Sequence, residues 1–345
     1  MMYFLDYAMY QGALKAAQEE FELGRKLTKQ ELIANANEGG IRLVRKKVEA
    51  ATDYSGHRDR LCDRADDLGL LHACTDTWLE VRTWNNDIRG VLTLFGLAAY
   101  SMFWGMATLP DWLGVIRLYQ TGLWTNGKAL TSSTPFEWLI SAIGATILAA
   151  AATWAMYRYL LRYEWPTQRW IRLRFNRKTR KVYLLRPKYA GGLMVFDWAD
   201  TQPDFPQNKN VDAPYLYWAF LGWRGKELGQ PLVSQFIGRR TSFKTTGDWM
   251  AFWEYIRRFM EEGPDSVPKP KNLIGHWPSL KEAWLSVTQW YPVLQQKGLR
   301  GKFSDGITVL ILPLILIILV GNFVGQCLTW QARFPKEIER AGNEP

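Results

Sequence analysis

The chain has 345 residues, 48% of them hydrophobic, and a formal net charge of +10 at pH 7. Its cysteines, Cys62, Cys74 and Cys327, are too few for the disulfide framework of a small secreted protein, and we interpret them as free thiols. The chain has no Walker-type phosphate loop, dinucleotide fingerprint, nucleophile elbow or H-E-x-x-H motif, and its histidines lie far apart. We therefore expect no catalytic residue, no metal site and no cofactor, which argues against an enzyme.

Residues 1–86 are polar, and apolar residues recur at helical spacing near their start until Gly39 and Gly40 break the pattern. We expect a cytoplasmic helical arm that either packs on a soluble domain or remains solvated. No secretory signal peptide is predicted, because the first residues lack a basic lead and Asp6 lies where an apolar core is needed.

Three apolar stretches are long enough to cross a bilayer. Residues 90–109 and 138–157 carry no charge, and each matches the roughly 20-residue helix that a hydrocarbon core requires. They predict a transmembrane hairpin over residues 87–163. A third transmembrane helix is expected over residues 304–330, whose Pro313 falls in the first turns, where a proline costs few backbone hydrogen bonds.

Basic residues are concentrated between the second and third apolar stretches. Residues 158–305 contain 25 Lys and Arg against 13 Asp and Glu, a net charge of +12, whereas the rest of the chain has a net charge of −2. Cations next to transmembrane ends stay on the cytoplasmic side, so this loop and residues 1–86 are expected in the cytoplasm. The same rule places an outer tail, residues 331–345, on the opposite side, which gives an N-in, C-out topology.

Residues 164–263 change from helical to strand-like patterning. Residues 170–175, WIRLRF, alternate apolar and basic side chains, residues 176–179 read as a turn, and residues 181–187 return as a second strand. Three further apolar runs follow before a helix begins. The pattern predicts a cytoplasmic domain of antiparallel strands followed by one amphipathic helix.

That closing helix has clear start and stop signals. Thr245, Thr246 and Asp248 are candidates for its N-cap, and Gly263 followed by Pro264 ends it. Its apolar residues recur at intervals of four, three and four, which predicts one face buried on the sheet. These residues are Trp249, Trp253, Ile256 and Met260.

This order of strands and helix resembles the pleckstrin-homology-like (PH-like) barrels of bacterial membrane proteins, in which a helical tryptophan plugs a bent antiparallel sheet. Trp249 or Trp253 would be that plug. The segments RFNRKTRKVYLLRP and WEYIRRFMEEGP are similar to a DUF6708-like family of uncharacterised bacterial membrane proteins often associated with type VI secretion and toxin gene clusters. The resemblance covers about residues 165–264 and the preceding hairpin, and it implies interaction or immunity roles at the bacterial inner membrane. It transfers no functional residue.

Residues 264–303 begin with a Pro/Lys linker and continue into a short helix, for which Ser279 and Glu282 form a capping box. The apolar face of this helix includes Trp284 and Val287. We expect it either to lie on the inner leaflet as an interfacial helix or to pack on the soluble domain.

Two groups of residues are candidates for binding. The first is a basic run that could bind anionic headgroups, each cation contributing about 1 kcal/mol near a charged leaflet; the alternative is that it only enforces topology and solvates the sheet. Its members are Arg169, Arg172, Arg174, Arg177, Lys178, Arg180 and Lys181. The second is an aromatic run too dense for one sheet face to bury, which predicts contact with a protein partner. Its members are Tyr215, Tyr217, Trp218, Phe220 and Trp223.

Together these features favour an α+β integral inner-membrane interaction protein. Its expected role is an immunity or accessory factor linked to a type VI secretion effector, with a protein partner bound by the cytoplasmic domain. The alternative is a membrane scaffold directed to anionic lipids, with no toxin partner. Nucleic acid is not expected as a partner, because the basic patch is tethered beside the membrane. The oligomeric state is left open.

Overall fold

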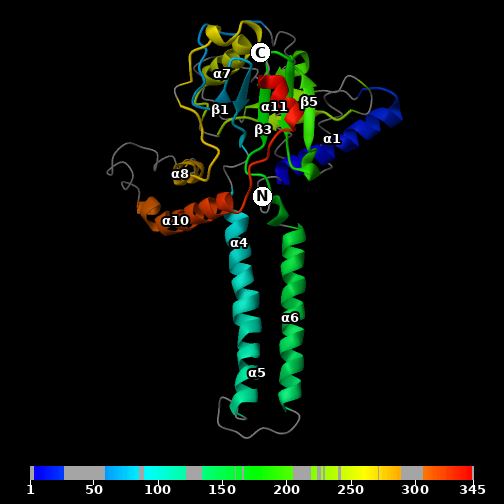
Figure 1. Ribbon diagram of the computed structural model, residues 1–345, viewed down its shortest axis with the longest axis vertical. Coiled ribbons are helices and arrows are strands. Elements are labelled where there is room, and N and C mark those ends of the chain that lie inside the picture. Colours follow the sequence, from blue (N-terminus) through cyan, green and yellow to red (C-terminus); the bar gives the residue numbers. More distant parts are fainter. Residues whose placement is uncertain are drawn as a thin grey trace.

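A domain built on β-sheets and a long helical hairpin projecting from it make up much of the described chain (Figure 1). The computed structural model describes residues 4–26, 59–84, 89–121, 134–159, 161–164, 167–204, 219–223, 227, 230–239, 242–270, 272–288 and 306–343. The architecture is mixed α+β with antiparallel sheets, as the sequence predicts.

The larger sheet has five antiparallel strands in the order β1-β2-β3-β4-β5. Their bounds are β1 Leu71–Cys74, β2 Trp78–Val81, β3 Arg172–Asn176, β4 Lys181–Leu185 and β5 Leu193–Asp197. The hairpin is inserted between β2 and β3, which pair from Trp78 opposite Asn176 to Val81 opposite Leu173. Segments on either side of the hairpin therefore build one sheet.

The prediction that residues 1–86 are a helical arm is wrong for residues 71–81, which form β1 and β2. Both strands have only four residues, too few for a period-two pattern to stand out. Strand β3, the second partner of β2, lies about ninety residues further along the chain, so no local signal marks that pairing. Residues 4–23 do form a helix, α1 (Phe4–Leu23), which packs on the domain near β8 and the 3-10 turn η4 (Lys188–Ala190).

A second antiparallel sheet has the order β6-β7-β8. Its strands are β6 Thr201–Pro203, β7 Phe220–Trp223 and β8 Val233–Phe236. An isolated antiparallel bridge between Thr83 and Ile237 joins the chain after β2 to the end of β8. Helix α7 (Thr246–Glu261) follows this sheet and packs into a core shared with the larger sheet.

The predicted start, stop and buried face of α7 are confirmed. Thr245 is the N-cap and forms a capping box with Asp248, and the chain leaves the helix through Gly263 and the 3-10 turn η6 (Pro264–Ser266). All four residues of the predicted face are at most 1% exposed, namely Trp249, Trp253, Ile256 and Met260. Trp253 stacks on Trp198, which lies in the 3-10 turn η5 (Trp198–Asp200), with ring centroids 5.4 Å apart.

The hairpin consists of two long helical arms. One arm is continuous through α4 (Val91–Tyr100), the π-helical segment η2 (Ser101–Thr108) and α5 (Leu109–Thr121), and the other is α6 (Thr134–Tyr159), followed by the 3-10 turn η3 (Leu161–Tyr163). Trp104 Nε1 donates to Thr153 Oγ1 at 3.0 Å, a cross-arm bond of the kind that holds apolar helices together. One described helical stretch, residues 136–163, is long and apolar enough to cross a membrane by length and composition.

The remaining helices are α8 (Leu280–Thr288), α10 (Gly306–Cys327) and α11 (Lys336–Asn343). Figure 1 shows α10 extending sideways from the domain end of α4 instead of running beside the arms of the hairpin, and α11 lying on the β-domain. Helix α8 packs on α10, and Ser279 Oγ accepts from Glu282 N at 3.5 Å, which is one half of the predicted capping box.

The predicted outer tail is wrong in its position. Residues after Trp330 return to the β-domain, where Phe334 is buried against Tyr183 and Glu339 forms an ion pair with Arg174 at 3.2 Å. The outer tail is predicted because residues 304–330 are interpreted as a third span. That span is inferred from length and lack of charge, which do not show what the two ends of the helix contact. The tail therefore packs on the β-domain instead of lying apart from it.

Candidate partner-binding site

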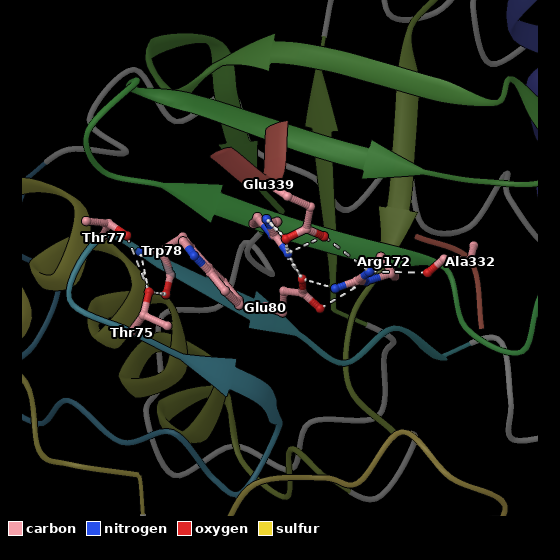
Figure 2. A network of polar contacts seen from close by, with 8 residues as sticks. Thr75, Thr77, Trp78, Glu80, Arg172, Ala332 and Glu339 are labelled. Atoms are coloured by element: carbon pink, nitrogen blue, oxygen red, sulfur yellow. Dashed lines mark hydrogen bonds and ion pairs between the residues drawn. The ribbon is translucent and has the colours of Figure 1, made fainter. Parts of the chain in front are cut away.

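A buried cluster of arginine and glutamate side chains lies on one face of the larger sheet (Figure 2). Glu80 on β2 accepts hydrogen bonds from the guanidinium groups of both Arg172 and Arg174 on β3, with Arg174 Nη2 at 2.6 Å and Arg172 Nε at 3.1 Å. Because residues two apart on a strand point to the same face, the β3 sequence R-L-R brings both cations to one carboxylate. Glu339 of α11 supplies a second carboxylate at 3.2 Å from Arg174.

This cluster holds the tail on the sheet. Glu80 and Arg174 are each 1% exposed, so their ion pair is buried. Glu339, whose side chain is 36% exposed, adds a second, partly solvated carboxylate beside Arg174. The Arg174 guanidinium carbon also lies 3.9 Å from the ring centroid of Trp78 and 4.6 Å from that of Phe334, so both rings add cation–π attraction.

The cluster continues through Trp78 to the turn between β1 and β2. Thr75 Oγ1 donates to Trp78 O at 3.0 Å and accepts from Trp78 N at 3.1 Å, which closes the turn shown in Figure 2. Thr77 O then accepts from Arg177 N at 2.8 Å, joining this turn to the one between β3 and β4. The two turns lie side by side at the same end of the sheet.

An open pocket of about 350 Å³ lies between these turns and the end of α7. It is lined by Asp76, Thr77, Arg177, Lys178, Arg180, Met260 and Glu261. Arg180 donates to both carboxylate oxygens of Glu261 at 2.7 and 2.8 Å, and Trp198 Nε1 also donates to that carboxylate at 2.6 Å. Arg177 makes no ion pair with any described residue, and its exposed guanidinium lies beside Gly263. The Glu261 carboxylate is thus held by Arg180 and Trp198, and cations outnumber carboxylates among the lining residues by three to two.

Strand direction fixes where this pocket points. Val81 leads into the hairpin and Arg172 follows it, so that end of the β2–β3 ladder faces the hairpin. Trp78 and Asn176 end the ladder on the other side, and the turn at residues 177–180 follows directly. The pocket therefore opens at the end of the sheet remote from the hairpin.

The seven predicted lipid-binding residues do not form one surface. Arg172 and Arg174 donate to Glu80 in the buried cluster. Arg169 donates to the backbone carbonyls of Gln326 at 3.0 Å and Thr329 at 2.8 Å. The other four, Arg177, Lys178, Arg180 and Lys181, lie at the turn remote from the hairpin. The basic run was continuous in sequence, but folding separates it into buried and remote halves.

The predicted aromatic surface is largely untested. Tyr215, Tyr217 and Trp218 lie outside the described residues. Trp223 does not belong to an exposed surface: it is 1% exposed, stacks on Phe196 and donates from Nε1 to Thr201 Oγ1 at 3.0 Å. Phe220 is half-buried against Phe236. The alternation along β7 explains this result, because Leu221 and Trp223 point into the core.

Sequence reasoning missed the polar junction at the base of the hairpin. Arg89 is 1% exposed and donates to four backbone carbonyls, those of Glu164, Gln168, Arg169 and Gly325. The Glu164 carboxylate accepts from Gly90 N and from Thr93 Oγ1. The sequence did offer a signal: Arg89 directly precedes the first apolar stretch and Glu164 follows the second, and charged residues at such positions need polar partners.

Two stacked histidines join the linker before α8 to the larger sheet. The rings of His72 on β1 and His276 lie 5.2 Å apart, and His72 Nδ1 is 3.1 Å from Ile274 O. Burial, with Arg82 and His276 adding to it, lowers the pKa of His72 to about 3. Burial also lowers the pKa of His276. No group of three metal-ligating side chains occurs among the residues that the structure describes.

This pair makes stability depend on pH. The pKa of His72 in the folded protein lies below its ordinary value of 6.5, so the unfolded chain binds more protons between pH 6.5 and about 3. We expect the free energy of unfolding to fall as pH falls through that window, by up to about 1.4 kcal/mol per pH unit for this one site. Urea denaturation in detergent between pH 7 and pH 5 measures the slope. His72→Gln should flatten it, and equal slopes would contradict the assignment.

The family comparison matches a model over residues 148–344, which run from the second half of α6 through the β-domain to the tail. The matched region contains β3 to β8, α7, α8, α10 and α11. No curated protein matches the chain, and no solved structure matches it either. Because the match covers more than half of the chain and includes the arginines of the buried cluster, this protein belongs to the family of unknown function DUF6708.

Proposed function

We propose that this chain is an integral protein of the bacterial inner membrane that binds a protein partner in the cytoplasm through its β-domain. The hairpin of α4–η2–α5 and α6 is the anchor, and the pocket at the remote end of the larger sheet is the binding site. The observation that supports this proposal most strongly is the exposed apolar surface of the hairpin, which suits a membrane anchor.

Large apolar side chains cover both arms of the hairpin and do not face the core of the β-domain. Phe95 is 57% exposed, Met106 77% and Leu148 72%. Soluble proteins rarely expose contiguous apolar patches above a few hundred Å², whereas a hydrocarbon core solvates such side chains well. The hairpin extends away from the β-domain, as expected for an anchor that holds a soluble domain at the surface (Figure 1).

Position and charge favour a protein partner over a lipid. A hairpin in the membrane places the pocket rim, with Arg177 and Lys178, on the far side of the β-domain from the bilayer. Headgroup attraction falls off within a Debye length, about 8–10 Å, so these cations contribute little to lipid binding from there. An acidic protein segment in the cytoplasm can approach this end of the sheet without contacting the bilayer. The resemblance to proteins of type VI secretion and toxin clusters suggests an immunity or accessory role, with an effector as the partner.

The test is copurification of the full-length protein from its native host in mild detergent, followed by mass spectrometry. We expect a stoichiometric protein partner that is lost from the double variant Arg177→Glu, Lys178→Glu, because reversing both rim charges repels an acidic surface. Lys188→Glu is the matched control: it reverses an exposed charge at the opposite end of the β4 strand and should retain the partner. Retention by both variants would reject the pocket as the binding site.

A further inference from the structure

We infer that α10 does not cross the membrane but lies in the plane of the bilayer surface, with both of its ends on the side of the β-domain. The occupant of its exposed apolar face is the lipid itself. The inference rests on the proposed anchoring by the hairpin, and it gives the protein a second contact with the same leaflet.

The chain before α10 is held on the β-domain side. Glu282 in α8 pairs with Arg82, which follows β2, and with Arg239, which follows β8. Burial alone would raise the pKa of Glu282, but Arg82 and Arg239 together lower it, so the carboxylate stays ionised and paired. Residues 289–305 connect α8 to α10, and they contain Lys297, Arg300, Lys302 and Asp305. A segment so short and so charged cannot supply the roughly 20 apolar residues of a span.

The chain after α10 is held on the same side. Arg169, which lies between the hairpin and β3, donates from its side chain to the carbonyls of Gln326 and Thr329, and its backbone N–H donates to Trp330 O at 2.6 Å. Beyond this point the tail reaches the buried cluster through Glu339. A helix whose two ends are tied to one side cannot be a single span.

The crossing of α10 over α4 is built for close contact. Gly90, the N-cap of α4, has φ 102°, and a Cβ there would clash with the backbone of Asn322. Asn322 Nδ2 donates to Arg89 O at 2.7 Å, and Gln326 Nε2 donates to Asn322 Oδ1 at 2.8 Å. These bonds fix the C-terminal half of α10 across the first turn of the hairpin, at the level where the hairpin leaves the β-domain.

Helix α10 has one covered face and one open face. Ile315 is fully buried against Val287 of α8. The open face carries Leu314, Ile317 and Val320 at intervals of three, and these side chains are 53%, 54% and 58% exposed. Three residues per step keep them on one side of the helix.

A bilayer fits this open face better than a protein partner does. Helix α10 packs on α4 at the base of the hairpin, whose arms also carry exposed apolar side chains. Two tryptophans lie at the ends of the adjoining segments, Trp330 after α10 and Trp277 before α8, and they are 54% and 83% exposed. Exposed tryptophans at this level are typical of a membrane–water interface.

Cysteine labelling of the full-length protein tests the topology. In a background with Cys62, Cys74 and Cys327 changed to Ser, one variant carries Gln120→Cys at the hairpin tip and another carries Lys336→Cys in the tail; both positions are exposed. We expect a membrane-impermeant maleimide to label the tip variant in intact spheroplasts, and to label the tail variant only after the membrane is permeabilised. Labelling of both in intact spheroplasts would overturn the inference and leave the anchor standing. An unlabelled tip would instead remove the hairpin anchor, and with it the proposed function.

The lipid contact is measured separately, in proteoliposomes of phosphatidylethanolamine and phosphatidylglycerol. A spin label on Ile317→Cys should collide more with dissolved oxygen than with a water-soluble nickel chelate, and one on Lys281→Cys, at an exposed position of α8, should show the reverse. Preference for the nickel chelate at Ile317→Cys would mean that α10 faces water, and it would overturn the inference even if the topology held.

Discussion

The Glu80→Ala variant should lose about 3–5 kcal/mol of unfolding free energy, the cost of leaving a buried charge without its partner. Glu80 is the carboxylate that Arg172 and Arg174 share, and it is 1% exposed. Its removal leaves the two guanidinium groups side by side, with the partly exposed carboxylate of Glu339 as the remaining partner. Urea denaturation of the detergent-solubilised protein, followed by tryptophan fluorescence, measures the loss.

Two further variants show that the loss comes from the buried pair. Glu339→Ala removes the carboxylate of the tail, whose side chain is 36% exposed, so solvent screening limits the loss to about 1 kcal/mol or less. Glu337→Ala, at an exposed position of the same helix, should change the free energy by less than about 0.5 kcal/mol. A loss at Glu80→Ala no larger than that at Glu339→Ala would show that the cluster does not stabilise the domain as argued.

The larger sheet shows which part of this fold was accessible from sequence. The alternation in WIRLRF correctly predicts that Arg172 and Arg174 share one face of β3. It cannot show that Glu80 lies opposite them, because the β2–β3 pairing spans the whole hairpin. The two arginines therefore looked available for lipid, although their partner was already in the chain. Interpreting a charged strand requires knowing its neighbour.

Helix α7 was accessible for the opposite reason. Its cap, its stop signal and its apolar face are all local, and each lies within one segment of the chain. The position of α10 was not accessible, because composition alone makes it look like a span. Its C-terminal end is held by contacts from Arg89 and Arg169, residues far from it in sequence, and the chain before it is held by the ion pair of Glu282 with Arg82. Charges that flank apolar helices are a better guide to such arrangements than helix length is.

The double variant Ile143→Asp, Leu148→Asp should abolish stable membrane integration. Both side chains lie on the exposed surface of α6, and Leu148 is close to the middle of the helix. A charged residue at the centre of a membrane helix costs about 2.5–3.5 kcal/mol, so two together exceed what the surrounding isoleucine and alanine residues recover. If the hairpin were exposed to water instead, the same changes would be neutral or would improve solubility.

Carbonate extraction of membranes measures the effect: the native chain should stay in the pellet, and the double variant should appear in the supernatant or be degraded. Leu273→Asp introduces the same charge at an exposed leucine of the linker and should leave the protein in the pellet, so extraction of this control as well would mean that added charge, and not its position in the hairpin, releases the protein.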